Sequence, residues 1–250
     1  MNLQTQLLTQ NDCYRAGRTI IPKGVMVHST GANNPRVCRY VPGNDVLGHN
    51  TRCNHWNRSG LSKCVHAFVG KFADGTVGAV QTLPWNWRGW HAGGAANRTH
   101  IGFEICEDGL EDSSYFEAVY QEAVELTVML CRTYCLAPEE DGVIICHSEG
   151  YRRGIASNHG DVMHWFPKHG KNMDEFRADV ARKLEGGKEV TYGEWRAYME
   201  QYRQELASQS ATMPELLKEA VDMGLTDGAR PRDLVTREEC AIMARAAGKT

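Results

Sequence analysis

The sequence has 250 residues, of which 42% are hydrophobic, and a formal charge of −3 at pH 7. This length allows one medium domain and a small appendage. The slightly acidic balance provides no basic field for phosphate backbones, and no apolar run is long enough to cross a bilayer, so we expect neither a nucleic-acid partner nor membrane insertion.

Cysteine usage and the N-terminal residues bear on the compartment. Nine cysteines, an odd number, in a chain that begins without a basic and apolar secretion pattern predict reduced thiols and a cytoplasmic protein until something releases it. The closest pair, Cys131 and Cys135, lies one helical turn apart and lacks zinc-knuckle spacing. A structural protein built on a cysteine-rich zinc centre is therefore disfavoured.

Strand and helix patterns alternate along the first three quarters of the chain. The predicted elements, in order, are a buried strand at 24–30, a hairpin around Asp74-Gly75, a strand at 100–106, an amphipathic helix at 113–136 capped by Asp112 or Ser113, an apolar strand at 142–146 and a helix at 172–184. The apolar strand is expected in a central position, buried on both faces. This order predicts an α/β domain with a mixed central sheet flanked by helices.

A composition break at residues 185–190 marks the predicted domain boundary. We expect a main domain at 1–185, a helical linker at 186–212 with a polar helix at 192–206, and a small helical module at 213–250. In that module two helices flank a Gly-containing loop, and Thr236 with Glu239 forms a capping box for the second.

Three side chains have the types and positions of a catalytic zinc site. His28 ends the first predicted strand, His147 follows the apolar strand, and Asp161 closes the Gly-punctuated loop after it. Catalytic zinc takes three protein ligands and keeps a fourth position for water. The pattern therefore predicts a zinc ion bound by His28, His147 and Asp161.

The segment WNWRGWH, residues 85–91, carries the predicted substrate contacts. Three tryptophans within six residues of a loop cannot all point inward, so at least one should border a groove and stack on sugar or peptide. Trp87, Trp90 and His91 are the candidates, and Arg88 could pair with a carboxylate of the substrate. His66 is interpreted as structural or as a neighbour of the site, and four other histidines carry no assignment: His49, His55, His100 and His169.

Four ordered motifs, VHST, RGWHAGG, IGFEICED and the loop ending SNHGD, resemble the type 2 N-acetylmuramoyl-L-alanine amidases, across about residues 23–184. This family includes phage wall-lysing enzymes and the peptidoglycan recognition proteins. The resemblance implies His28 and His147 as the first two zinc ligands and Asp161 as the third, where other members use Cys. The family usually places the third ligand closer to the second, so His159 and His164 are alternatives.

The resemblance also implies the reaction. Glu104 matches a glutamate that handles the proton of the attacking water, and His159 occupies a position that is often Lys, from which it can donate to the oxyanion. The substrate implied is peptidoglycan, cut between the lactyl group of N-acetylmuramic acid and L-Ala. A phage endolysin is the first interpretation. A cytoplasmic amidase that recycles wall fragments and a non-catalytic peptidoglycan-binding protein are the alternatives.

The C-terminal module resembles part of an S-layer homology repeat between residues 213 and 247. Such repeats act in sets, so a single copy would bind the wall weakly or require self-association. A helical tail that packs on the catalytic domain or mediates oligomerisation is the alternative, and the oligomeric state is not fixed by the sequence.

Overall fold

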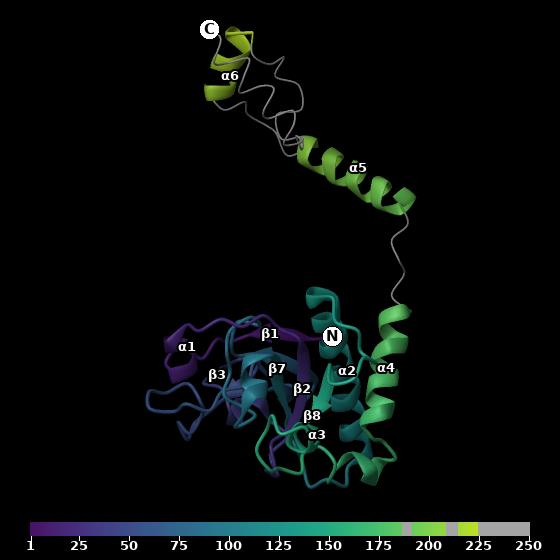
Figure 1. Ribbon diagram of the computed structural model, residues 1–250. Helices are drawn as coiled ribbons and strands as arrows, with labels where there is room; N and C mark the ends of the chain where they lie inside the picture. The colour runs from purple at the N-terminus through teal and green to yellow at the C-terminus, as the bar shows by residue number, and fades with distance from the viewer. Residues whose placement is uncertain (187–191, 209–214, 225–250) are drawn as a thin grey trace. The chain divides into compact units, whose positions relative to one another are not determined.

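A six-stranded mixed sheet forms the centre of the first of two units in this computed structural model (Figure 1). The structure describes residues 1–186, 192–208 and 215–224. The strand order is β1-β6-β5-β7-β2-β8, and every pairing is parallel except β5 with β6. The strands are β1 (Leu3–Thr5), β2 (Gly24–Ser29), β5 (Ala67–Lys71), β6 (Val77–Gln81), β7 (His100–Ile105) and β8 (Ile144–Cys146). The predicted α/β fold with a mixed sheet is confirmed.

The hairpin predicted around Asp74 and Gly75 joins β5 to β6. Gly75 has a φ of +87°, a left-handed conformation that glycine adopts without steric cost. Asp74 Oδ1 accepts a hydrogen bond from the Thr76 backbone N–H at 2.9 Å, which closes the turn. The local sequence therefore sets the one antiparallel pairing of the sheet.

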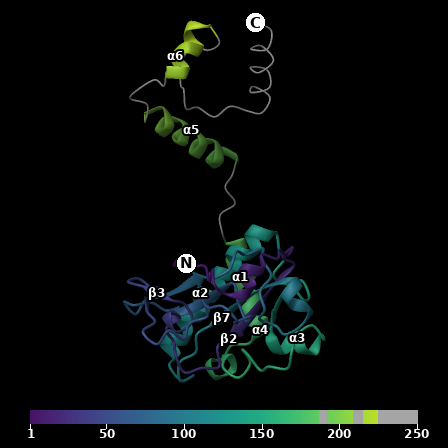
Figure 2. The ribbon, with the colours of Figure 1, turned by 90° about the vertical axis from the view of Figure 1, so that its left-hand side faces the viewer.

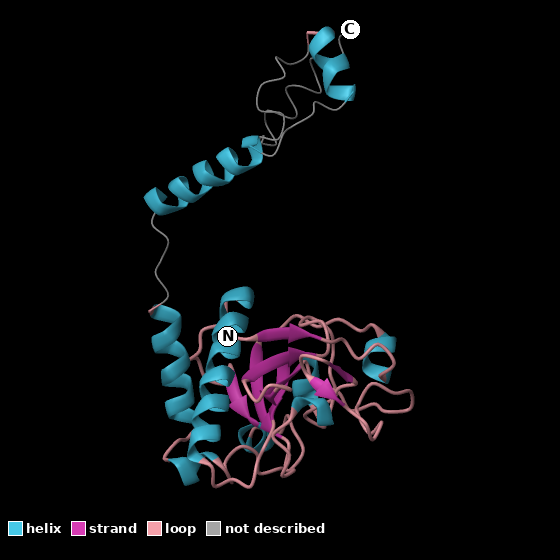
Figure 3. Ribbon diagram, turned by 180° about the vertical axis from the view of Figure 1, so that it is seen from behind, coloured by secondary structure: helices cyan, strands magenta, loops and turns pink. Residues whose placement is uncertain are grey.

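Two helices lie side by side along one face of the sheet, α2 (Ser113–Tyr134) and α4 (Met173–Glu185) (Figures 1 and 3). Both were predicted, and both begin at a capping side chain: Asp112 accepts from two N–H groups of α2, and Asn172 accepts from Glu175 N. Their buried aromatic residues, Phe116, Tyr120 and Phe176, join the main core against the sheet.

The other side of the sheet carries loops and short elements, and Figure 2 turns this side toward the viewer. A second apolar cluster packs here around Phe68 of β5, with Tyr40 stacked on its ring at 4.6 Å between centroids. The short elements of the unit are α1 (Asp12–Ala16), η1 (Val37–Arg39), β3 (Gly43–Asn44), β4 (Gly48–His49), η2 (Ala95–Arg98), α3 (His147–Arg152) and η3 (Phe166–His169). With apolar clusters on both faces, the interior strands β2 and β7 are buried along almost their whole length.

The predicted central position of the strand at 142–146 is wrong, because β8 lies at the edge of the sheet. Its three residues are nevertheless buried, since α3 and α4 contact the strand. Arg177 of α4 donates from Nη1 to the Ile144 carbonyl at 2.9 Å, which satisfies a group that an edge strand would leave open. An apolar sequence predicts burial but not which neighbour provides it.

The second unit comprises residues 188–250. Its described helices are α5 (Tyr192–Ser208), which confirms the helix predicted at 192–206, and α6 (Glu215–Asp222). The predicted capping box of Thr236 and Glu239 lies outside the described residues. Among the helices of the described ranges, none combines the length and the apolarity that a membrane span requires.

Candidate metal centre and catalytic cleft

Three adjacent parallel strands, β7, β2 and β8, have their carboxyl ends on the same side of the sheet, and the candidate site lies at these strand ends. His28 of β2 is the register partner of Glu104 in β7. On the other side, Val27 of β2 is level with Cys146 of β8, and His147 follows directly. Ligands of open α/β sheets bind at the carboxyl ends of the strands. The topology thus brings together residues that are far apart in the chain.

The three predicted ligands converge on one point. His28 Nδ1 lies 3.1 Å from His147 Nδ1 and 3.1 Å from Asp161 Oδ2, and His147 Nδ1 lies 3.5 Å from the same oxygen. A tetrahedral zinc ion with bonds of about 2.0–2.1 Å separates its ligand atoms by roughly 3.3 Å. The nitrogen and oxygen donor set is also one that zinc uses. The residues present therefore fit a zinc ion.

The protonation states that the fold favours suit metal binding. Burial lowers the pKa of His28, which keeps its imidazole neutral near neutral pH. Burial alone would raise the pKa of Asp161, but the contacts of its carboxylate with the His147 and His28 side chains outweigh it and hold that pKa well below its ordinary value. Metal ligation needs a neutral imidazole and an ionised carboxylate. The cluster provides both.

Glu104 lies in the same cleft as a buried carboxyl group with a free oxygen. The cleft has a volume of about 380 Å³. Within the part of the chain that the structure describes, Glu104 Oε2 and Ser29 Oγ are buried without a hydrogen-bond partner. Burial, followed by the charges of Asp161 and Glu107, raises the pKa of Glu104 to about 8. A carboxyl group with this pKa can take up and release a proton near neutral pH.

The two alternative third ligands have other partners. His159 lines the cleft, and its Nδ1 lies 3.1 Å from Ser157 Oγ. His164 donates from Nε2 to Glu107 Oε1 at 2.9 Å. Glu107 also accepts from the Gly31 backbone N–H, so it ties two loops of the cleft together. The compact ligand cluster found among the described residues contains Asp161 and neither of these histidines.

The predicted substrate contacts divide into two groups. Trp90 and His91 line the cleft, and the Trp90 side chain is 45% exposed. Trp87 instead packs against Tyr14, with ring centroids 4.9 Å apart. Arg88 lines a neighbouring cavity and lies 5.5 Å from the centre of the Trp90 ring. The structure therefore brings two of the four residues to the cleft.

Two lining residues, Lys63 and Ser157, were not anticipated. Lys63 lies in a loop with no motif around it, so only the fold could reveal it. Ser157 stands two residues before His159 in SNHGD, and a search for polar neighbours of the predicted ligands could have found it. His66 has a structural role, since its buried ring bonds the backbone of Trp87 and Gly102, and burial lowers its pKa to about 4.

Comparison with known proteins identifies the family. A family model described as N-acetylmuramoyl-L-alanine amidase matches residues 16–164, more than half of the chain. The chain belongs to this family. No curated protein sequence matches it closely enough to count as a relative.

Solved structures with a similar fold include two that match over most of their own length. The Staphylococcus aureus hydrolase AmiA, determined in complex with its ligand, is 19% identical over 78% of this chain and 86% of its own, with a TM-score of 0.57. PlyL is 19% identical over 72% of this chain and 97% of its own, with a TM-score of 0.51. At this identity the likeness concerns the fold.

Proposed function

We propose that this member of the amidase family is a zinc-dependent N-acetylmuramoyl-L-alanine amidase that cuts peptidoglycan between the lactyl group of N-acetylmuramic acid and L-Ala. One observation carries the proposal: ligand atoms of His28, His147 and Asp161 converge beside a buried Glu104 oxygen that has no partner of its own. Family membership supplies the substrate class.

The amide bond is a poor electrophile with a poor leaving group. Its hydrolysis therefore needs catalysis both of the attack by water and of the departure of the amine. A zinc ion held by the three ligands supplies Lewis-acid chemistry, which polarises the scissile carbonyl and makes water easier to deprotonate. Glu104 removes a proton from the attacking water as the water oxygen bonds to the carbonyl carbon. Glu104 then returns the proton to the leaving nitrogen as the C–N bond breaks. The products are a lactyl carboxylate and a free L-Ala amino group.

His159 and Trp90 assist this reaction from the walls of the cleft. We assign to the imidazolium form of His159 the hydrogen bond that stabilises the oxyanion of the tetrahedral intermediate, donated from Nε2, because the oxygen gains negative charge as water adds. The exposed face of Trp90 stacks on a sugar or on the stem peptide. Arg88 contacts the Trp90 ring and supports it.

The activity is tested by digesting purified cell wall and analysing the new chain ends. The proposal expects new L-Ala amino termini without new reducing sugars, and it expects Glu104→Gln to release almost none. New reducing ends would instead identify a glycosidase. A protein that sediments with walls but produces no new termini would be the non-catalytic binding protein.

We also propose that the enzyme acts as a phage endolysin, with the second unit, residues 188–250, directing it to the wall. Truncation after Gly186 separates this role from catalysis. Wall targeting predicts that the truncated enzyme cleaves soluble muropeptides at the full-length rate but sediments poorly with intact walls. Equal sedimentation would contradict targeting, and a change in oligomeric mass would favour a self-association role.

A further inference from the structure

The ligand histidine His28 has a close polar neighbour at each ring nitrogen, and its outer contact fixes its tautomer. His28 Nε2 lies 2.9 Å from His91 Nδ1, and His91 Nε2 lies 3.2 Å from the carbonyl oxygen of His100. A carbonyl oxygen only accepts, so His91 carries its hydrogen on Nε2 and accepts at Nδ1. His28 therefore donates from Nε2, and its Nδ1 keeps a lone pair that faces the ligand cluster.

His147 is held in the same tautomer by a hydroxyl group. Its Nε2 lies 3.2 Å from Ser157 Oγ, which in turn lies 3.2 Å from the Ala92 carbonyl oxygen. We assign the single hydroxyl proton to the carbonyl, which can only accept, so that Ser157 Oγ accepts from His147 Nε2–H. Its other lone pair accepts from Nδ1–H of His159 at 3.1 Å. His147 Nδ1 is thereby left unprotonated as well.

Both outer contacts depend on one stretch of backbone, residues 91–92. The buried Asn97 side chain accepts from the N–H groups of His91 and Ala92 at 2.8 and 2.9 Å, and Ser157 N donates to the Ala92 carbonyl at 2.8 Å. Gly102 of β7 leaves room for the imidazole, because a Cβ there would lie 2.4 Å from His91 Nδ1. The loop is thus held by hydrogen bonds at a place where the strand has no side chain.

We propose that His91 and Ser157 are positioning residues that lock both ligand histidines as Nε2–H tautomers, so that both Nδ1 lone pairs point at the metal position before the ion arrives. The inference rests on the metal site of the proposed function and assigns His91 a role other than substrate contact. A metal-ligating histidine is oriented, and its tautomer fixed, by the group that is hydrogen-bonded to its other ring nitrogen. Loss of that group typically weakens metal binding by about 10–100-fold.

The test measures zinc affinity by competition with a chelator, in the absence of peptidoglycan. His91→Phe keeps a ring but removes the acceptor, and Ser157→Ala removes the hydroxyl, so each should weaken zinc binding by about 10–100-fold. His91→Asn places an amide oxygen near the position of Nδ1 and should retain most of the affinity. The matched control is His169→Asn, since His169 Nε2 also donates to a backbone carbonyl, that of Leu110, at 3.1 Å. The control should bind zinc like the parent chain.

A second measurement reads the tautomer of His159, which follows from the same assignment of the Ser157 hydroxyl proton. Nitrogen-15 shifts of the metal-free chain, recorded at a pH that keeps the rings neutral, should show His159 protonated at Nδ1, the opposite of the form that water favours. The inference would be overturned if His91→Phe and Ser157→Ala bound zinc as tightly as the parent chain, or if His159 were protonated at Nε2. Either result would leave the amidase proposal standing. A parent chain that binds no zinc would overturn both.

Discussion

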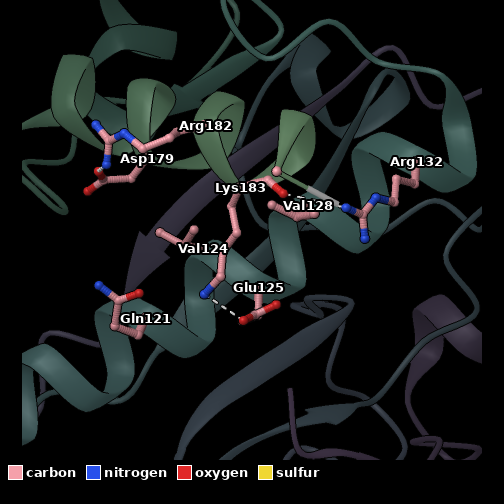
Figure 4. Close-up of a pocket in the computed structure, with 9 residues that line it drawn as sticks. Gln121, Val124, Glu125, Val128, Arg132, Asp179, Arg182 and Lys183 are labelled. Atoms are coloured by element: carbon pink, nitrogen blue, oxygen red, sulfur yellow. Dashed lines mark hydrogen bonds and ion pairs between the residues drawn. The ribbon is translucent and has the colours of Figure 1, made fainter. Parts of the chain in front are cut away.

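Two cavities of this protein differ in how far their polar groups are satisfied. The cavity between α2 and α4 is the larger, about 530 Å³ against about 380 Å³ for the cleft at the sheet edge. Figure 4 shows that Lys183 pairs with Glu125 across it. Arg182 pairs with Asp179 at 2.7 Å on the same helix. The cleft instead holds unpartnered oxygens of Glu104 and Ser29.

The difference indicates where chemistry is to be expected. Buried polar groups in proteins are almost always hydrogen-bonded, so an exception calls for an explanation such as a bound ion or a catalytic role. Both carboxylates between the two helices have a cationic partner within the fold, and Arg132 donates to backbone carbonyls of α4. In the cleft, Glu104 Oε2 and Ser29 Oγ are left available to a partner from outside. The smaller cleft holds both the converging ligand atoms and the unpartnered Glu104 oxygen, so volume alone does not identify the functional site here.

The largest effect is expected from Asp161→Ala, which removes one of the three proposed zinc ligands. The parent chain should bind about one zinc ion, and the variant should lose both the metal and the activity, because two histidines alone hold zinc poorly. Metal analysis after gel filtration measures this. His164→Ala is the control and should keep its zinc, since His164 is bonded to Glu107. The opposite pattern would make His164 the third ligand.

Glu104→Gln tests whether the free carboxyl oxygen is catalytic. The amide has nearly the same shape but cannot exchange a proton with water, so turnover should fall by about 10²–10⁴-fold while zinc binding persists. Single-substrate kinetics on a soluble muropeptide, together with metal analysis, separate the two effects. Near-normal turnover would remove Glu104 from the mechanism.

Glu104→Gln should also change how the stability of the metal-free protein depends on pH. Burial raises the pKa of Glu104 from 4.5 to about 8, so between these values the folded state holds a proton that the unfolded state has lost. Stability therefore falls as pH rises, by about 1.4 kcal/mol per pH unit from this group. Urea unfolding of metal-free protein should show Glu104→Gln gaining stability over the parent from about pH 5 to 8. Parallel pH curves would contradict the raised pKa.

The smallest effect is expected in the cavity between the helices. Lys183→Ala removes an exposed ion pair with Glu125, which should cost no more than about 1 kcal/mol of unfolding free energy. Zinc content and amidase rate should not change, because every charge there has a partner in the fold. A large loss of activity in Lys183→Ala would show that the cavity between the helices also serves the reaction.

Much of the fold and part of the site could be predicted from local sequence. His28 and His147 each follow a run of buried strand residues, and parallel strands end at the same edge, so their proximity was predictable. The caps Asp112 and Asn172 marked where α2 and α4 begin. These features are local, which is why the sequence reveals them.

Other features depend on packing between distant segments. β8 is buried at the edge of the sheet because α4 and its Arg177 cover it, which the apolar sequence of the strand does not disclose. The role of His91 depends on a loop lying against Gly102 of β7, and Lys63 reaches the cleft from a loop with no distinguishing pattern. Such contacts are set by the tertiary fold, so no spacing in the chain encodes them.

The most direct test of the central claim is a crystal of the zinc-loaded protein, with anomalous scattering recorded on both sides of the zinc absorption edge. The account predicts one strong peak among His28 Nδ1, His147 Nδ1 and Asp161 Oδ2, in the cleft that Glu104 lines. A zinc-loaded crystal with no peak there, or with its peak at other residues, would contradict the assignment of this cleft as a zinc amidase site.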